Sequence, residues 1–229
     1  MRSSIPYQPN DAATIQSIRM VKKPAESCFL VLDNGDEVLL RLEVVLAARL
    51  EKGQKLTIAQ MEDLLRADAE SRCRLAAWRL LNVRPRSETE LRRALRQRQH
   101  LTPAIDGIVA ELKEKGFLDD QSFAQGFVQQ RTARRQGPRL IQQELKTRGV
   151  ARPVVQEVMD GAVSDDKQRE DMEVLLTRWN RRSKPEDAKK RAQAAAAYLL
   201  RRGFDPALVW PAIRAFFGRV VEQDEEPAP

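Results

Sequence analysis

The sequence predicts a mainly α-helical protein, with three tandem three-helix modules in an elongated, curved array behind a small region that contains a β-hairpin. Apolar residues recur at helical spacing almost without interruption after residue 72. The phrase LKTRGV at 145–150 returns as LLRRGF at 199–204, and a proline and a further apolar helix pattern follow each. Aromatic residues make up 5% and charged residues 32% of the chain, which is typical of helical proteins with large exposed faces.

The N-terminal region, residues 14–71, carries the only β pattern. Thr14–Val21 alternates loosely between polar and apolar residues, and Cys28–Leu32 is a compact apolar run. Asn34-Gly35 then supplies a hairpin turn signal, because both residues tolerate the positive φ that such turns demand. Val38–Leu42 returns as the second arm. Residues 1–13 are polar and contain proline, and we expect them to be disordered.

The rest of the chain indicates helices. One begins at Glu43 and stops by Gly53, and a second begins at Thr57 and continues as a long connector through Leu81. We place the three modules at 72–117, 118–162 and 163–217, and a mobile acidic tail at 218–229.

Helix boundaries are clearest in the first and middle modules. Ser87 with Glu90 three residues later is a capping box, in which the hydroxyl accepts an otherwise unpaired amide. Asp119-Asp120 predicts the start of a helix, since carboxylates cap helix N-termini and complement their dipole. Gly137-Pro138 predicts a break, and Gly149 the end of the next helix.

The net charge of +7 is unevenly placed along the chain. Residues 1–71 hold 9 Lys and Arg against 11 Asp and Glu, whereas residues 72–160 hold 18 against 10. Residues 161–219 hold 13 against 8, and the last ten residues hold four acids and no base. The basic charge therefore belongs to the helical modules and suggests an anionic partner, such as nucleic acid or an acidic protein surface.

Arginines around the predicted break in the middle module form the leading candidate binding patch. Arg131, Arg134 and Arg135 share one helix face by the i, i+3, i+4 rule, and Arg139 follows the turn. No acidic residue stands at those spacings, so we expect these charges not to be neutralised locally. An ordinary solvated surface is the alternative for each. The further basic sets are Arg178, Arg181, Arg182 and Lys184; Lys189, Lys190 and Arg191; and Arg201 and Arg202.

No pattern indicates catalysis, a metal or a cofactor, and we expect the protein not to be an enzyme. Cys28 and Cys73 are isolated, and His100 is the only histidine. No Gly-rich phosphate loop or nucleophile motif occurs. No segment is apolar enough for a signal peptide or a membrane span, which predicts a cytoplasmic protein without a membrane partner. We expect one tryptophan per module in the core: Trp78, Trp179 and Trp210.

The chain resembles the RecX family of recombination regulators over about residues 72–217, most specifically in the middle module. The positions that carry the resemblance are Ser87–Leu91, Gly116–Asp120, Phe123-Ala124, Phe127-Val128, Arg131, Gly137, Arg139, Ile141, Glu144-Leu145 and Gly149. The resemblance implies tandem three-helix units that bind the RecA recombinase filament and modulate its ATPase, strand exchange and SOS co-protease functions, usually by inhibition. Some family members also bind single- or double-stranded DNA. We expect a monomer without cofactors.

Two other functions remain open from the sequence. Residues 87–118 have the pattern of a helix-turn-helix, as in a transcription factor whose second helix enters a DNA groove. A winged version would need a β-hairpin directly after Gly116, where this chain has a helical pattern instead. A general DNA-binding protein would share nearly all of the signals of the filament regulator.

Overall fold

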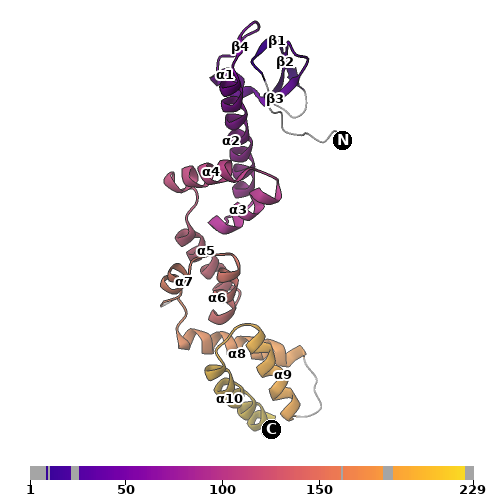
Figure 1. Cartoon of the computed structure of the whole chain (residues 1–229). Coiled ribbons are helices and arrows are strands. Elements are labelled where there is room, and N and C mark those ends of the chain that lie inside the picture. Colours follow the sequence, from indigo (N-terminus) through magenta and orange to yellow (C-terminus); the bar gives the residue numbers. More distant parts are fainter. Residues whose placement is uncertain (1–8, 10, 22–25, 161, 183–187, 225–229) are drawn as a thin grey trace. The chain divides into compact units, whose positions relative to one another are not determined.

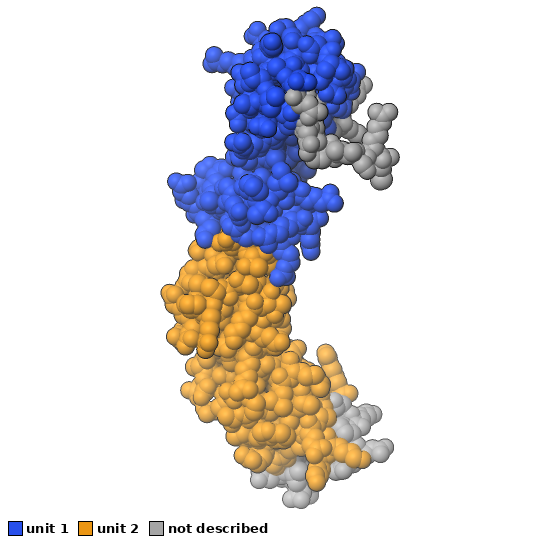
Figure 2. Space-filling model, viewed as in Figure 1, with its two compact units in different colours: residues 1–85, 91–117 blue, residues 86–90, 118–229 orange. Residues whose placement is uncertain are grey.

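The computed structural model describes residues 9, 11–21, 26–160, 162–182 and 188–224. These residues form ten helices and one small antiparallel sheet, which confirms the predicted fold class (Figure 1). They divide into two compact units, residues 1–85 with 91–117 and residues 86–90 with 118–229 (Figure 2). Most of the predicted disordered segment 1–13, and residues 225–229 of the predicted tail, lie outside the described residues.

Unit 1 begins with a four-stranded antiparallel sheet in the order β3-β2-β1-β4. Its strands are β1 (Ala13–Val21), β2 (Ser27–Leu32), β3 (Glu37–Arg41) and β4 (Lys55–Leu56). The predicted hairpin joins β2 to β3, and Gly35 in its turn has a φ of +86°. Alternate residues such as Leu30 and Leu40 are fully buried under the helices. The two residues of β4 are too few to leave an alternating pattern in the sequence.

Helices α1 (Leu42–Ala47) and α2 (Ile58–Val83) follow the sheet (Figure 1). α2 starts where the sequence predicts, because Thr57 and Gln60 form a capping box. The carboxylate of Asp68 on α2 accepts the backbone amide of Arg41 at 2.6 Å and pairs with Arg72, so it ties the helix to the end of β3.

Beyond the sheet, α2 packs against α4 in unit 1. The remaining helices of this region are α3 (Glu88–Gln97), whose first residues belong to unit 2, and α4 (Thr102–Glu114). Pro103 lies in the first turn of α4, where its missing amide costs nothing. The residues predicted to form its apolar stripe are buried: Ile105, Ile108, Val109 and Leu112.

Unit 2 contains a module of α5 (Asp120–Ala133), α6 (Pro138–Thr147) and α7 (Arg152–Met159). Asp119 caps α5, since its carboxylate accepts the amides of Gln121 and Ser122 at 3.0 Å. The bonds from Ser122, and then that from Gln121, lower the pKa of Asp119 because they favour its charged form. The cap interpretation of Asp119 is therefore confirmed.

The last helices of unit 2 are α8 (Asp165–Arg182), α9 (Ala188–Arg201) and α10 (Pro206–Asp224). The predicted tail is therefore helical from residue 218 to residue 224. Trp179 packs against their core and Trp78 is half-buried, but the core prediction for Trp210 is wrong, since it is 45% exposed. The buried stripe of α10 runs through Val209 and Ile213, and the residue after Val209 is turned about 100° away from it.

Two equivalent joints in unit 2 each connect the end of one helix to the start of a helix that lies three places earlier in the chain. In the first joint, the end of α6 meets residues 87–90. The Ser87 hydroxyl donates to the carbonyl of Arg148 at 2.5 Å, and the Thr89 hydroxyl donates to the carbonyl of Gly149 at 3.1 Å. These carbonyls end a helix and have no partner within it, so the two hydroxyls satisfy groups that would otherwise lack one.

In the second joint, the end of α9 meets the start of α6. The amide of Gly137 donates to the carbonyl of Arg202 at 2.8 Å, and the amide of Arg139 donates to the carbonyl of Gly203 at 3.0 Å. When residues 87–95 are aligned with residues 137–145, so that Leu95 matches Leu145, Gly137 corresponds to Ser87 and Arg139 to Thr89. The two joints therefore use the same positions, with backbone donors in one and side-chain donors in the other.

The second joint leaves no space for a side chain at Gly137. Its φ of −75° suits any residue, but a Cβ atom there would lie 2.3 Å from the backbone of Gly203. We predict that Gly137→Ala lowers the free energy of unfolding by about 1–3 kcal/mol through overpacking. Gly126→Ala is the matched control, because a Cβ there meets open space in the middle of α5.

The control substitution should stabilise the protein by about 0.5–1 kcal/mol, since alanine is the better helix former. Urea unfolding followed by circular dichroism measures both values. Equal effects of the two substitutions would show that the joint is not closely packed.

Candidate partner-binding surface

The prediction that Arg131, Arg134 and Arg135 share one helix face is wrong. α5 ends at Ala133, and Arg135 takes the left-handed conformation with a φ of +52°. The i, i+4 relation between Arg131 and Arg135 therefore does not apply, because it requires the helix to continue. The sequence analysis placed the break between the two helices at Gly137-Pro138, but α5 already ends at Ala133.

Arg131 is held inside the module rather than offered to a partner. Its guanidinium pairs with Glu144 of α6 at 2.8 Å, and the two side chains are 17% and 27% exposed. It also lies over the ring of Phe127, 4.7 Å from the centroid. The expectation that this charge is not neutralised locally is wrong, since Glu144 comes from the following helix, where helical spacing gives no hint of it.

Two further arginines of the predicted patch also have acidic partners. Arg135 pairs with Asp171 of α8 at 3.2 Å, and that aspartate is buried with 6% of its side chain exposed. Arg139 pairs with Asp205 at 3.3 Å, where both side chains are more exposed. An exposed pair of this kind contributes about 0–1 kcal/mol, so Arg139 stays accessible to a stronger partner.

Arg134 is exposed, as Arg139 is. Its side chain has no ion-pair partner among the residues that the structure describes, although its carbonyl accepts a bond from Arg202. Of the predicted patch, Arg134 therefore offers an uncompensated charge, and Arg139 offers a weakly compensated one.

The second predicted basic set lies at the end of α8. Arg178, Arg181 and Arg182 are all exposed, and their spacing places them on one face of the helix. Within the described part of the chain none of the three has an ion pair. Positive charge in the last turn also stabilises a helix through its dipole, by about 0.3–1 kcal/mol. Lys184 of this set lies outside the described residues.

The third predicted set, at the start of α9, is divided. Lys189 and Lys190 are exposed. Arg191 is half-buried, donates to the side-chain oxygen of Asn180, and lies over the ring of Phe217 at 5.9 Å from its centroid. The structure thus gives Arg191 a packing role between helices. Arg201 is exposed, whereas Arg202 belongs to the second joint.

Some side chains that matter for the joints escaped the sequence analysis. Asp120 accepts the amide of Glu88 at 2.8 Å, in addition to its place at the start of α5. Arg148 pairs with Glu90 and lies over the same Phe127 ring as Arg131, at 4.8 Å from the centroid. Arg148 and Arg202 occupy equivalent positions in the repeated phrase. That repetition is the sequence signal that could have indicated their shared place at the joints.

The described residues contain no group of side chains placed to hold a metal ion. Both cysteines are buried, and burial raises the pKa of the Cys73 thiol to about 11, so it is protonated at neutral pH. No helix in the described part of the chain is long and apolar enough to cross a membrane. We define the exposed basic set of unit 2 as Arg134, Arg178, Arg181, Arg182 and Lys190.

Comparison with known proteins gives consistent matches along the chain. Residues 73–112 match the model of the RecX first three-helix domain, and residues 119–159 match the RecX second three-helix domain. The regulatory protein RecX of Geobacillus thermodenitrificans is 28% identical over 218 residues, which cover 93% of this chain and 81% of the relative. The RecX of Listeria innocua is 31% identical over 152 residues, which cover 66% of this chain and 56% of the relative.

Solved structures have the same fold. A crystal structure of regulatory protein RecX matches 89% of this chain and 99% of its own with a TM-score of 0.65 and 22% identity. The RecX of Lactobacillus salivarius matches 65% of this chain and 97% of its own with a TM-score of 0.55 and 21% identity. The two domain matches, the relatives that cover most of the chain and the shared fold agree, and the chain belongs to the RecX family of regulatory proteins.

Proposed function

We propose that this protein is a cytoplasmic regulator that binds the RecA recombinase filament as a monomer and inhibits its ATPase, strand exchange and SOS co-protease activities. The observation that carries the proposal is membership of the RecX family, which implies regulation of RecA. The protein would act by occupying filament surface rather than by chemistry, which fits the description of its relatives as regulatory proteins.

The exposed basic set supports an anionic binding surface. A recombinase filament on DNA presents phosphates as well as acidic side chains, and uncompensated arginines attract both. Arg178, Arg181 and Arg182 are the strongest candidates, because they share a helix face and need not break an ion pair within the described structure to bind. Arg139 can exchange its weak partner Asp205 for a phosphate.

Arg131, Arg135 and Arg191 are proposed to act indirectly, by keeping the modules in shape. Each is half-buried, and each contacts a side chain of a neighbouring helix. A substitution at these positions would weaken partner binding only as a result of lost stability. This assignment distinguishes arginines with a structural role from arginines that bind a partner, although both carry the same charge.

General DNA binding is the alternative that the exposed basic set also favours. Both functions would weaken as salt rises, because binding to phosphates releases counterions. The two functions differ in their partner: a filament regulator acts on the recombinase, whereas a general DNA-binding protein binds DNA without it. A helix-turn-helix transcription factor would instead protect a defined DNA site from cleavage.

The first prediction concerns ATP hydrolysis by RecA on single-stranded DNA. Titration of this protein from zero to equimolar should suppress hydrolysis at well below one copy per recombinase, since a bound regulator affects filament beyond the site that it occupies. Unchanged hydrolysis at equimolar protein, with DNA binding retained, would contradict the proposal and favour the general DNA-binding protein.

The second prediction concerns the end of α8. The triple variant Arg178→Ala, Arg181→Ala, Arg182→Ala should raise the concentration needed for half-inhibition about tenfold or more at moderate salt, because it removes three uncompensated charges. The triple variant Lys52→Ala, Lys55→Ala, Arg79→Ala is the matched control, since it removes the same charge from exposed positions of unit 1.

The control should inhibit as the unaltered protein does. If both triple variants lose inhibition equally, overall charge and not the end of α8 governs binding. If neither loses it, the assignment of this surface is wrong.

A third prediction separates structural from binding arginines. Arg131→Ala should lower the free energy of unfolding by about 1–3 kcal/mol, because it leaves Glu144 unpaired and removes the contact with Phe127. Arg134→Ala, close by at the end of α5, should change it by less than about 0.5 kcal/mol. Thermal and urea unfolding measure both, and similar values for the two variants would refute the distinction.

A further inference from the structure

Unit 1 has a groove of about 610 Å³ between α1 and α2, and Gln54 and Leu56 at β4 also line it. Its floor is apolar and consists of the core residues Val44, Leu50, Leu56 and Leu64. Alanines line its sides at positions 47, 48 and 67, and their small side chains leave the space open. The volume lies within the range of about 300–1,000 Å³ that is usual for sites that hold small ligands.

The rim of the groove is acidic. Glu43, Asp63 and Glu70 all line it. Among the described residues, Asp63 pairs with Arg66 at 3.5 Å, where both side chains are about 70% exposed and the pair is weak. Glu70 has no ion-pair partner in the part of the chain that the structure describes. Glu43 accepts a bond from Ser71 and lies 3.8 Å from Arg41, which has a closer partner in Glu26.

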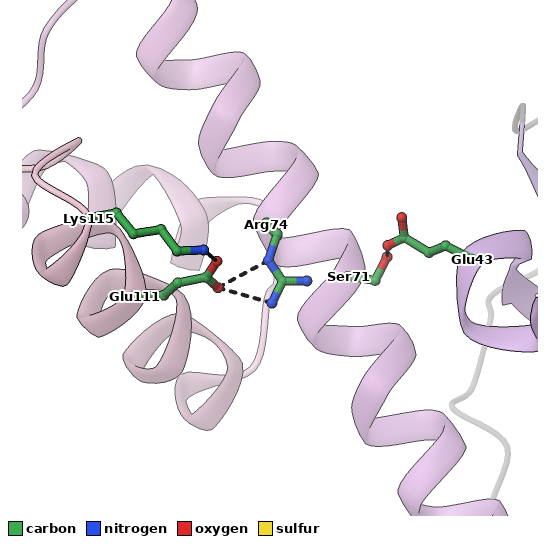
Figure 3. Close-up of polar contacts among 5 residues, drawn as sticks. All are labelled: Glu43, Ser71, Arg74, Glu111 and Lys115. Atoms are coloured by element: carbon green, nitrogen blue, oxygen red, sulfur yellow. Dashed lines mark hydrogen bonds and ion pairs between the residues drawn. The ribbon is translucent and has the colours of Figure 1, made fainter. Parts of the chain in front are cut away.

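Arg74 is the one base among the lining residues, and its charge is already compensated. Figure 3 shows its guanidinium directed toward α4, where it contacts Glu111 at 3.0 Å, while Glu43 and Ser71 meet on the other side of α2. Lys115 and Arg74 together lower the pKa of Glu111, so that carboxylate stays ionised and keeps hold of Arg74. The groove therefore presents an apolar floor inside a field of net negative charge.

We propose that this groove binds a basic amphipathic segment of a protein partner. Apolar side chains at i, i+3 and i+4 of such a segment would fill the space above Leu56 and Leu64, and its lysines or arginines would meet Asp63, Glu70 and Glu43. Charge complementarity selects this occupant, because a nucleic acid or an acidic segment would be repelled by the rim. The site is separate from the exposed basic set of unit 2 and has the opposite electrostatic character.

A binding assay with designed peptides tests the proposal without recombinase or DNA, so its result is independent of the proposed function. The probe is a short labelled helical peptide with leucines at i, i+3, i+4 and i+7 and lysines on its other face. A second peptide with glutamate in place of each lysine is the control. Fluorescence anisotropy with the full-length protein should show micromolar binding of the lysine peptide and at least about tenfold weaker binding of the glutamate peptide.

Two pairs of variants on α2 locate the binding. Glu70→Lys reverses a charge of the rim, and Glu62→Lys makes the same change at an exposed position outside the groove. Ala67→Trp fills the groove, and Ala59→Trp places the same side chain on α2 away from it. Glu70→Lys and Ala67→Trp should each weaken binding of the lysine peptide about tenfold, whereas the two controls should leave it within about twofold. Circular dichroism confirms that each variant is folded.

Three results would overturn the proposal. The first is binding of both peptides with equal affinity, or of neither at several hundred micromolar. The second is unchanged binding by Glu70→Lys and Ala67→Trp. The third is self-association in sedimentation velocity that Ala67→Trp abolishes and Ala59→Trp does not, since the occupant would then be a second copy of this chain.

Discussion

The fold of unit 2 depends on how the ends of its helices satisfy one another's backbone groups. Every helix leaves unpaired carbonyls at its C-terminus and unpaired amides at its N-terminus. In the second joint the carbonyls of Arg202 and Gly203 accept the amides of Gly137 and Arg139, so one contact satisfies both helices. Such close approach requires glycine on both sides, which makes these positions sensitive to any added atom. The backbone groups that a short helix leaves unpaired at its ends therefore form the hydrogen bonds that link the two helices.

Contacts between helices then distinguish the basic residues that the fold itself uses from those that it leaves exposed. Arg131, Arg135 and Arg191 contact side chains of neighbouring helices, so their charges are used within the fold. Arg178 and Arg181 lie at a helix end with no such contact in the described structure. The second group is open to a partner without the loss of such a contact, whereas breaking the half-buried pair of Arg131 or Arg135 to bind a phosphate would leave a carboxylate uncompensated. The net charge of a module is therefore a poor guide to its binding surface.

The two units differ in the surface chemistry that they offer. The groove of unit 1 combines an apolar floor with Asp63 and Glu70 at its rim, whereas unit 2 exposes arginines. Under the proposed function both surfaces would have a use, since one suits phosphates and the other suits a basic protein segment. The acidic balance of residues 1–71 is consistent with this division.

The sequence by itself determined the helices, the hairpin and the caps, because these depend on neighbours within a few residues. Thr57 and Asp119 cap their helices, and Gly149 ends one, through contacts that local spacing predicts. The tertiary structure alone decided which arginines are free, since Glu144 and Asp171 approach Arg131 and Arg135 from other helices. It also decided the exposure of Trp210 and the groove of unit 1, which arise where separate elements meet. The physical reason is range: periodicity and capping are local, whereas charge compensation and packing depend on residues distant in the chain.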